Sequence, residues 1–400
     1  MDTYRVRRYD NHRAVEVEVD CSVVRSVRPI EPLEPAGEEL PFAAPGLLDI
    51  QINGSRHWEF ASSKLTVDGV REVIESVIDS GTFRFCPTMT THAPEVLVHS
   101  AEIIGRALRD YPQYDAVVAG IHLEGPFISS VEGPRGAHRL EYVQSSYDLD
   151  LIDAMNRASG GRMKIVTFSP EYDGFGDFIA GLTARGIIPA IGHTNASPVD
   201  IARAAAAGAR LSTHLANATY HLLPKEGNYF FAQLTDDRLR ASIIADGFHL
   251  SPMMVKTILR GKGLERLILV SDLSGLAGLP PGVYDTELCE LEILESGRIV
   301  LASNPRLLAA ASLPLAQDLC MMMAFTGLTM NEVFRAATVH PAALLGISAF
   351  PNGRDDDFLA VDAPAAFFTF RHRPSALSRD GLADWEGLRR GAFEIEKIVR

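Results

Sequence analysis

The chain contains 400 residues, of which 46% are hydrophobic and 22% are charged, and its formal net charge is −13. This balance is typical of a folded globular protein and excludes a disordered or fibrous chain. The acidic charge argues against a nucleic-acid partner, because no basic stripe is available to neutralise phosphates. A length of this order favours one large domain with a smaller one beside it.

The four cysteines lie far apart in the sequence and form no Cys-x-x-Cys pair. They are Cys21, Cys86, Cys289 and Cys320. This spacing predicts reduced thiols in a cytoplasmic protein, not a disulfide framework or a zinc cluster. Residues 1–30 carry charges throughout and lack the apolar core of a signal peptide. No uncharged apolar stretch reaches the roughly 18 residues that a membrane helix needs, so we expect no membrane association.

Both ends of the chain read as β-structure. Apolar and polar residues alternate within Arg13–Arg28, which is the period of a strand with one buried face. Near the other end, Phe358–Val361 and Ala365–Phe370 also have the composition of strands. We predict that residues 1–45 and 349–400 meet in space as a small β-sandwich domain.

Residues 46–348 alternate short apolar runs with segments of helical periodicity. The strand candidates are Gly46–Ile52, Thr82–Met89, Val117–Glu124, Met163–Glu171, Gly186–His193, Ala209–Asn217, Arg240–His249 and Arg266–Asp272. Leu313–Gly327 and Asn331–Ile347 predict further helices at the end of this region. Apolar strands that alternate with helices indicate a parallel sheet covered on both faces. Eight such strands predict an α/β fold, a TIM-like (β/α)8 barrel that forms the catalytic domain.

Polar side chains stand where these apolar runs end. They are Gln51, Asn53, His122, Glu124, His193, His214, Asp246, His249 and Asp272. The carboxyl ends of the strands of a parallel barrel share one rim, and such enzymes keep their active sites there. Histidines scattered through a core would not be expected to align in this way.

Three of these residues form a candidate metal site. Either His193 or His214 alone would more commonly be a structural histidine, but their joint placement with Glu124 favours metal ligation. Two imidazoles and one carboxylate suit zinc or a similar divalent ion and leave a position for water. Iron, manganese and cobalt accept the same ligands. An ion of this kind lowers the pKa of water toward neutrality and polarises a carbonyl group.

Asp272 ends the eighth strand, facing the predicted metal site. It could cap the next helix, but its position favours a general base. His249 is a candidate hydrogen-bond donor to a substrate carbonyl, with a structural role as the alternative. His122 precedes Glu124 by two residues and shares its face of the strand, and we interpret it as a supporting residue.

Taken together, these segments resemble the N-acetylglucosamine-6-phosphate deacetylases of the amidohydrolase superfamily. The resemblance runs in consistent order from about residue 43 to about residue 347. The matching stretches are Pro45–Gly54, His122–Phe127, Gly136–His138, Gly192–Ala196, Thr213–Ala218, Ile243–His249 and Val270–Asp272.

The resemblance implies hydrolysis of N-acetylglucosamine 6-phosphate to glucosamine 6-phosphate and acetate, in a homodimer. It makes Glu124, His193 and His214 the metal ligands and Asp272 the catalytic acid and base. It implies substrate contacts for Ala137, His138, Asn217, Ala218, Asp246 and His249. Many amidohydrolases hold a second metal through a His-x-His on the first strand. Gln51 and Asn53 stand there in this chain, and amides are poor zinc ligands, so we predict one metal, with zinc as the first choice.

The chain departs from the family around the sugar phosphate. Family members commonly carry an arginine soon after the Asn-Ala pair, and Lys225 is the nearest cation in register here. Lysine can hold a phosphate as a point charge but not bidentately. A small insertion also precedes Gly136, and residues 308–312 read Leu-Ala-Ala-Ala-Ser in place of the usual small-residue loop. These differences keep open an amidohydrolase acting on an unphosphorylated or different N-acyl substrate. A non-catalytic metabolite-binding barrel is a further alternative, which the presence of all three ligands and of Asp272 disfavours.

Overall fold

An eight-stranded parallel sheet forms the centre of the computed structural model, which describes residues 1–30, 40–220, 222–287, 289–372 and 393–400. The strand order is β14-β13-β12-β11-β10-β9-β8-β5, so neighbours in sequence are neighbours in space. Their bounds are β5 Leu47–Ile52, β8 Thr82–Thr90, β9 Ile121–Glu124, β10 Met163–Phe168, β11 Ile188–Ile191, β12 Leu211–Ser212, β13 Arg240–Ile243 and β14 Leu267–Leu269. Each falls within or against one of the eight predicted runs, and the barrel is confirmed.

The barrel closes where the last strand meets the first. Ile52 and Leu273 form a single parallel bridge. Asp272 donates its backbone N–H to Gln51 O at 3.0 Å, and Asn53 donates to Leu273 O at 2.8 Å. These contacts bring the residues that follow β14 directly beside the end of β5.

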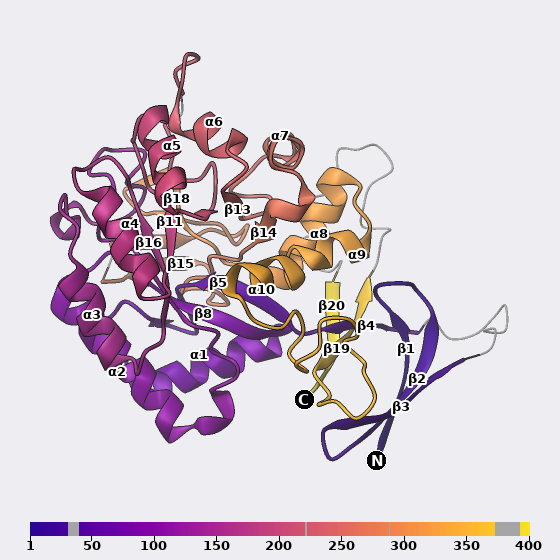
Figure 1. Cartoon of the computed structure of the whole chain (residues 1–400). Helices are drawn as coiled ribbons and strands as arrows, with labels where there is room; N and C mark the ends of the chain where they lie inside the picture. The colour runs from indigo at the N-terminus through magenta and orange to yellow at the C-terminus, as the bar shows by residue number, and fades with distance from the viewer. Residues whose placement is uncertain (31–39, 221, 288, 373–392) are drawn as a thin grey trace.

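Helices cover the outside of the barrel (Figure 1). They are α1 Val67–Asp79, α2 Pro94–Asp110, α3 Leu149–Ala158, α4 Phe175–Ala184, α5 Pro198–Ala207, α6 Tyr229–Thr235, α7 Pro252–Lys262, α8 Leu315–Thr326, α9 Met330–Arg335 and α10 Val339–Leu345. In α1, Val70, Val73 and Val77 recur at helical spacing and are buried, so one face packs on the sheet. Thr66 caps that helix by accepting from Gly69 N at 3.0 Å. Among the described residues, we find no helix that combines the length and the apolar character needed to cross a lipid bilayer.

Both chain ends contribute to a separate six-stranded sheet of order β20-β19-β4-β1-β2-β3 (Figure 1). The strands are β1 Asp2–Arg8, β2 Ala14–Asp20, β3 Val23–Pro29, β4 Phe42–Pro45, β19 Phe367–His372 and β20 Phe393–Val399. Val23 forms a further bridge with Pro364, so the sheet curls back toward the segment before β19. The expected domain from both ends is present as a separate sheet. Residues 31–39 and 373–392, which also belong to the predicted domain, lie outside the described residues.

Aromatic packing attaches this terminal sheet to the barrel. Phe334 of α9 stacks on Phe370 of β19 with ring centroids 5.9 Å apart. Tyr9 contacts the same Phe334 ring at 4.7 Å. All three side chains are buried, so the two parts share one continuous apolar core.

A second, smaller sheet is inserted between β14 and α8, and the sequence did not lead us to expect it. It is antiparallel, with the order β15-β16-β17-β18. Its strands are β15 Gly282–Asp285, β16 Glu290–Ile293, β17 Ile299–Leu301 and β18 Asn304–Ala310. Leu308, Ala309 and Ala310, which stand in place of the family's small-residue loop, belong to β18. We refer to β15–β18 as the inserted sheet.

Candidate active site

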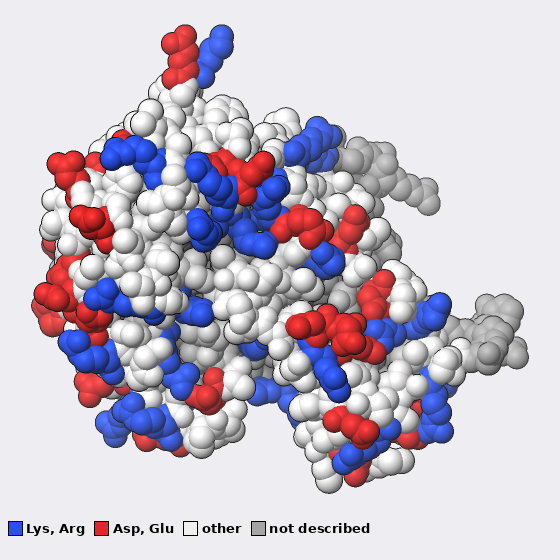
Figure 2. Space-filling view, viewed as in Figure 1, with Lys and Arg blue, Asp and Glu red and all other residues white. Residues whose placement is uncertain are grey.

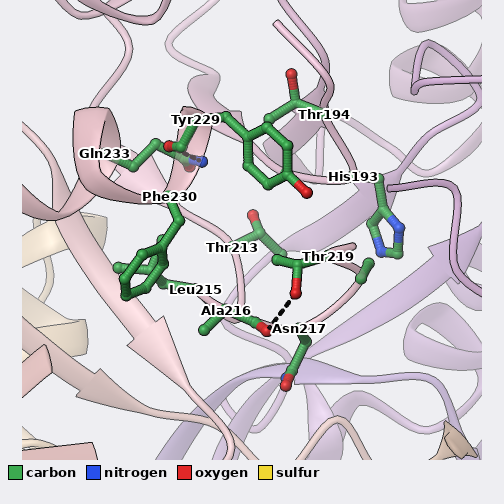
Figure 3. Close-up of a pocket in the computed structure, with 12 residues that line it drawn as sticks. His193, Thr194, Thr213, Leu215, Ala216, Asn217, Thr219, Tyr229, Phe230 and Gln233 are labelled. Carbon is green, nitrogen blue, oxygen red and sulfur yellow. Dashed lines mark hydrogen bonds between the residues drawn. The ribbon is translucent and has the colours of Figure 1, made fainter. Parts of the chain in front are cut away.

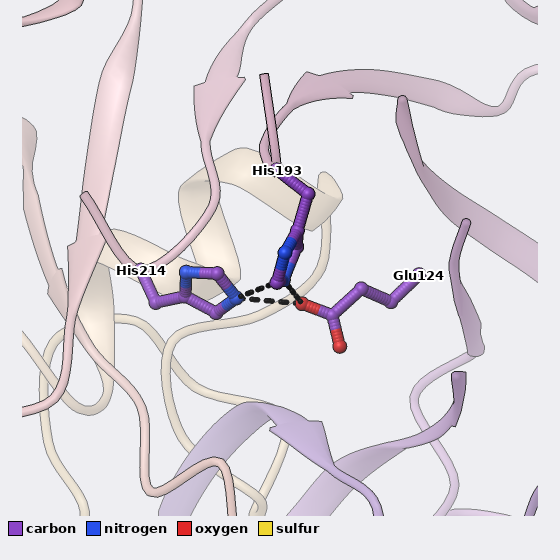
Figure 4. A group of neighbouring side chains, drawn as sticks. All are labelled: Glu124, His193 and His214. Atoms are coloured by element: carbon purple, nitrogen blue, oxygen red, sulfur yellow. Dashed lines mark hydrogen bonds and ion pairs between the residues drawn. The ribbon is translucent and has the colours of Figure 1, made fainter. Parts of the chain in front are cut away.

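Glu124, His193 and His214 converge at the rim where the barrel strands end (Figure 4). Oε1 of Glu124 lies 3.1 Å from Nε2 of His193 and 2.6 Å from Nε2 of His214. The two Nε2 atoms are 3.1 Å apart. All three side chains are buried, and they are the one group of this kind that the described part of the chain brings together.

The hydrogen bonds of His193 indicate which of its nitrogens faces the group. Nδ1 lies 3.1 Å from the carbonyl oxygen of Pro134 and 3.2 Å from that of Arg135. Carbonyl oxygens only accept, so Nδ1 carries the proton and Nε2 presents its lone pair. This orientation by a backbone carbonyl is the usual arrangement for a metal-binding histidine. The donor set therefore fits one divalent metal.

The electrostatics of the group also favour a cation. Burial opposes ionisation of Glu124, but His214 and His193 outweigh burial and hold the pKa of Glu124 well below its usual value. Burial likewise disfavours a charged His214, yet the carboxylate of Glu124 raises the pKa of His214 to about 8. A buried carboxylate thus stabilises positive charge at the point where the three side chains meet.

Strained backbone places these side chains. His193 has φ 46°, His214 has φ 29° and Asp272 has φ 54°, all in the left-handed region. Residues other than glycine seldom occupy this region, and those that do cluster at functional sites. In each case the residue turns sharply at the end of its strand, which directs the side chain over the barrel mouth.

α6 packs beside the loop that carries His214, and the two share a small cavity (Figure 3). Tyr229, Phe230 and Gln233 line a small cavity behind residues 213–219. The hydroxyl of Tyr229 accepts from Tyr220 N at 3.0 Å. This hydrogen bond ties the segment after His214 to α6.

Two amides of the first strand connect the metal ligands with Asp272. Nε2 of Gln51 lies 3.0 Å from Glu124 Oε1 and 3.0 Å from Asp272 Oδ1. Nδ2 of Asn53 donates to the same Asp272 oxygen at 2.8 Å. Burial and the charge of Glu124 raise the pKa of Asp272 to about 6. Two amide donors thus hold the carboxylate of Asp272, and its pKa lies near neutral pH. Such a pKa suits a group that takes up and releases a proton.

A cavity of about 1310 Å³ opens over this group. Its walls contain the metal-site residues, Asp272 and most of the substrate contacts implied by the resemblance. Those contacts are Ala137, His138, Asn217, Ala218 and His249. His138 lies beside the candidate metal ligands, with its Nε2 3.2 Å from Nε2 of His193. The sequence-predicted residues therefore meet in one place, with Asp246 and Lys225 as the exceptions.

Comparison with known proteins gives a consistent result, although no protein-family model matches the chain. A human protein named N-acetylglucosamine-6-phosphate deacetylase is 32% identical over 334 residues, which are 80% of this chain and 79% of that one. The chain belongs to the N-acetylglucosamine-6-phosphate deacetylase family. A relative with the same name from Bacillus subtilis is 29% identical and covers 87% of this chain and 88% of its own length.

Solved structures of the family have the same fold. The N-acetyl-D-glucosamine-6-phosphate deacetylase of Mycobacterium smegmatis, solved as a variant in complex with N-acetyl-D-glucosamine-6-phosphate, is 26% identical. The match covers 93% of this chain and 96% of that one, with a TM-score of 0.78. A dihydroorotase at 13% identity and a TM-score of 0.58 shares the fold alone.

Asp246 lies behind the cavity wall of this deacetylase-family site. It is 1% exposed, and its Oδ2 accepts from Nδ1 of His249 at 2.8 Å. Burial opposes both charges, but the pairing raises the pKa of His249 and lowers the pKa of Asp246. Asp246 thus binds Nδ1 of His249, and the Nε2 edge of the imidazole is left toward the cavity.

Lys225 is exposed and does not line the cavity of its own chain. Its segment projects from the surface beside α6, and Figure 2 shows basic and acidic side chains at the tip of this projection. Leu222, at the start of the described part of the segment, is 89% exposed. Within one chain, the lysine in register with the family arginine is therefore not brought to the site.

Several residues of this cavity were not predicted from the sequence. Arg135 follows the insertion before Gly136, and Arg298 lies in the inserted sheet. Leu291, Leu301 and Leu307 of that sheet add an apolar wall. The alternation in Glu290–Ile293 and the turn at Ser296-Gly297 were available as signals of a hairpin.

Proposed function

We propose that the chain hydrolyses the N-acetyl amide of N-acetylglucosamine 6-phosphate, giving glucosamine 6-phosphate and acetate. The observation that carries this proposal is the convergence of Glu124, His193 and His214 with Asp272 at one barrel rim. The family to which the chain belongs supports the same reaction, because its named members are deacetylases of this sugar phosphate.

The site residues have complementary tasks in this reaction. The ion held by the three ligands would supply water activation and carbonyl polarisation. Asp272 takes a proton from the attacking water and later gives it to the leaving nitrogen. His249 in its protonated form donates from Nε2 to the carbonyl oxygen as negative charge develops there. His138, Asn217 and Ala218 hold the sugar.

We propose one zinc ion per chain. The nitrogen and oxygen donors of the three ligands suit zinc, although iron, manganese and cobalt bind the same set. Gln51 and Asn53 occupy the first-strand position where other amidohydrolases carry histidines. Their amide nitrogens already donate to carboxylates, which supports a single ion.

Acetate release from purified enzyme tests the proposal. N-acetylglucosamine 6-phosphate, its galacto isomer and the two unphosphorylated sugars form the substrate panel. We expect the highest kcat/KM for N-acetylglucosamine 6-phosphate, and loss of turnover after chelation that added zinc restores. Preference for an unphosphorylated sugar would favour the alternative amidohydrolase. No release from any N-acyl substrate by metal-loaded protein would favour a metabolite-binding barrel.

We further propose a cytoplasmic homodimer in which the projecting segment of one chain delivers Lys225 to its partner. The exposure of Lys225 and Leu222 supports a contact outside the chain's own cavity. The four free cysteines suit a reducing compartment. Within each chain, residues 46–348 would form the catalytic domain and the two ends the smaller one. Light scattering on the purified protein measures the oligomeric state directly.

A further inference from the structure

Arg298 places a cation in the cavity from an unexpected direction. It lies between β16 and β17 of the inserted sheet, after the turn at Gly297. Its side chain lines the same cavity as Glu124, His193 and Asp272. The inserted sheet thus contributes a guanidinium group to the cavity, in addition to its apolar residues.

The guanidinium of Arg298 has no partner among the described residues. Its Nε is buried and makes no hydrogen bond within the described part of the chain. Arg84, another arginine inside the fold, also has a buried Nε without a partner, but its two terminal nitrogens donate to Ser348 O at 2.7 Å and Ala349 O at 2.6 Å. A buried donor without an acceptor is costly, so such a group commonly meets its partner in a ligand.

Another unsatisfied donor lies in the same cavity. Nδ2 of Asn217 is buried without a partner and lines the cavity. Oγ of Ser312 is also buried and unpartnered, but this serine does not line the cavity. The two nitrogen donors of Arg298 and Asn217 suit a ligand rich in oxygen and negative charge.

Arg135 is the other described arginine of the cavity wall, and one of its terminal nitrogens is already engaged. That nitrogen donates to Ser130 O at 3.1 Å, and the backbone carbonyl of Arg135 faces His193, although its Nε is buried without a partner. Of the two described arginines that line the cavity, Arg298 is therefore the less engaged. The family arginine is absent from its usual place, and Lys225 is exposed and does not line this cavity.

We propose that Arg298 binds the phosphate of the substrate from within the same chain and so determines the preference for a phosphorylated sugar. This inference rests on the proposed deacetylase function. A planar guanidinium can hold two phosphate oxygens at once, which a lysine cannot do. The inserted sheet would then set substrate specificity, while the barrel rim carries out the chemistry.

The test compares Arg298→Met and Arg298→Lys with a matched control, Arg106→Met, whose arginine is 61% exposed on α2. Each variant is assayed with N-acetylglucosamine 6-phosphate and with N-acetylglucosamine. Loss of a charge-assisted bidentate contact should lower kcat/KM for the phosphorylated sugar by roughly 10- to 100-fold, mainly through KM. The value for the unphosphorylated sugar should stay within about twofold, and Arg298→Lys should lie between the wild type and Arg298→Met.

Binding of glucosamine 6-phosphate, measured by calorimetry, provides a readout that does not depend on turnover. It should weaken by a similar factor in Arg298→Met and remain unchanged in Arg106→Met. Equal losses on both sugars, unchanged kinetics in Arg298→Met, or a wild type that does not prefer the phosphorylated sugar would each overturn the role of Arg298. Absence of acetate release from every sugar in the wild type would instead overturn the proposed deacetylase function.

Discussion

Nδ1 of His249 donates to Oδ2 of Asp246 at 2.8 Å, so only Nε2 of this histidine remains to face the cavity. The same carboxylate accepts from the backbone N–H of Phe248 at 2.7 Å and of His249 at 2.9 Å. A neutral His249 held in this way would present a lone pair to the substrate, and only the protonated form can donate. Asp246 therefore controls the role of His249 through its charge.

Asp246→Asn tests this control. The neutral amide no longer raises the pKa of His249, so the protonated donor form is lost at lower pH than in the wild type. We expect the alkaline fall of kcat to shift to lower pH, and kcat at pH 8 to drop roughly 10- to 100-fold. Elemental analysis should find the same amount of bound metal in the variant as in the wild type. A wild-type pH profile in the variant would contradict the assignment.

Asp272→Asn removes the proton carrier and leaves the metal ligands in place. We expect kcat to fall by roughly 10²- to 10⁴-fold, because general acid–base catalysis contributes on that scale. The metal content should match that of the wild type. Turnover close to the wild-type rate would rule out Asp272 as the acid and base.

His193→Ala should lose metal and activity together, unlike the preceding variant. The histidine supplies one of three buried donors, and two donors hold a divalent ion weakly. Elemental analysis and acetate release, measured on one preparation, check both effects. Retention of a full equivalent of metal would show that the ion lies elsewhere.

Glu287 fastens the inserted sheet to the barrel rim. Its carboxylate accepts from Ser63 N at 3.0 Å and from Ser63 Oγ at 2.8 Å, and it lies 3.3 Å from Nε2 of His92. Glu287→Ala should raise KM severalfold with little change in kcat, because the cavity wall is no longer held. Glu290→Ala, an exposed carboxylate of the same sheet, serves as the control. Equal KM values in the two variants would contradict this role.

Lys262 gives a prediction about stability. It is 1% exposed and donates from Nζ to Gln233 O at 2.6 Å, and burial lowers its pKa to about 8. The unfolded chain keeps this proton to about pH 10.5, so the charge on Lys262 destabilises the fold below pH 8. That cost disappears as the pH rises from 8 to 10.5, and stability should rise with it.

A comparison of the thermal unfolding of the wild type with that of Lys262→Met measures this effect. The melting temperature of the wild type, relative to that of the variant, should increase between pH 8 and pH 10.5. Lys256→Met removes an exposed lysine from the same helix and should show no such trend relative to the wild type. A constant difference between the wild type and Lys262→Met would show that the buried amine does not titrate in this range.

The barrel and the metal group could be predicted because both follow from regular patterns. The apolar runs fix the strands, and the shared rim of a parallel barrel then brings Glu124, His193 and His214 together without any knowledge of loops. The side-chain direction of Asp246 could not be predicted in the same way. It depends on the local turn at Gly247, where φ is 77°, and not on a period of the sequence.

The inserted sheet could not be predicted from the sequence either. Its strands are short, and no sequence motif indicates that they pack over the cavity. Arg298 belongs to the hairpin of β16 and β17, and the place of this sheet over the cavity depends on tertiary contacts such as those of Glu287 with Ser63. Chain direction at a strand end is predictable, whereas the docking of an insertion depends on tertiary packing.

The terminal sheet has a consequence for biosynthesis. β4 is flanked by β1 on one side and by β19 on the other, so it is completed only by residues made near the end of translation. While the ribosome produces the barrel, the edge of β4 that later receives β19 stays without its neighbour. Such an edge can recruit a chaperone or pair with another nascent chain. The pairing of β4 with β19 is therefore a step that can follow only after synthesis of the barrel.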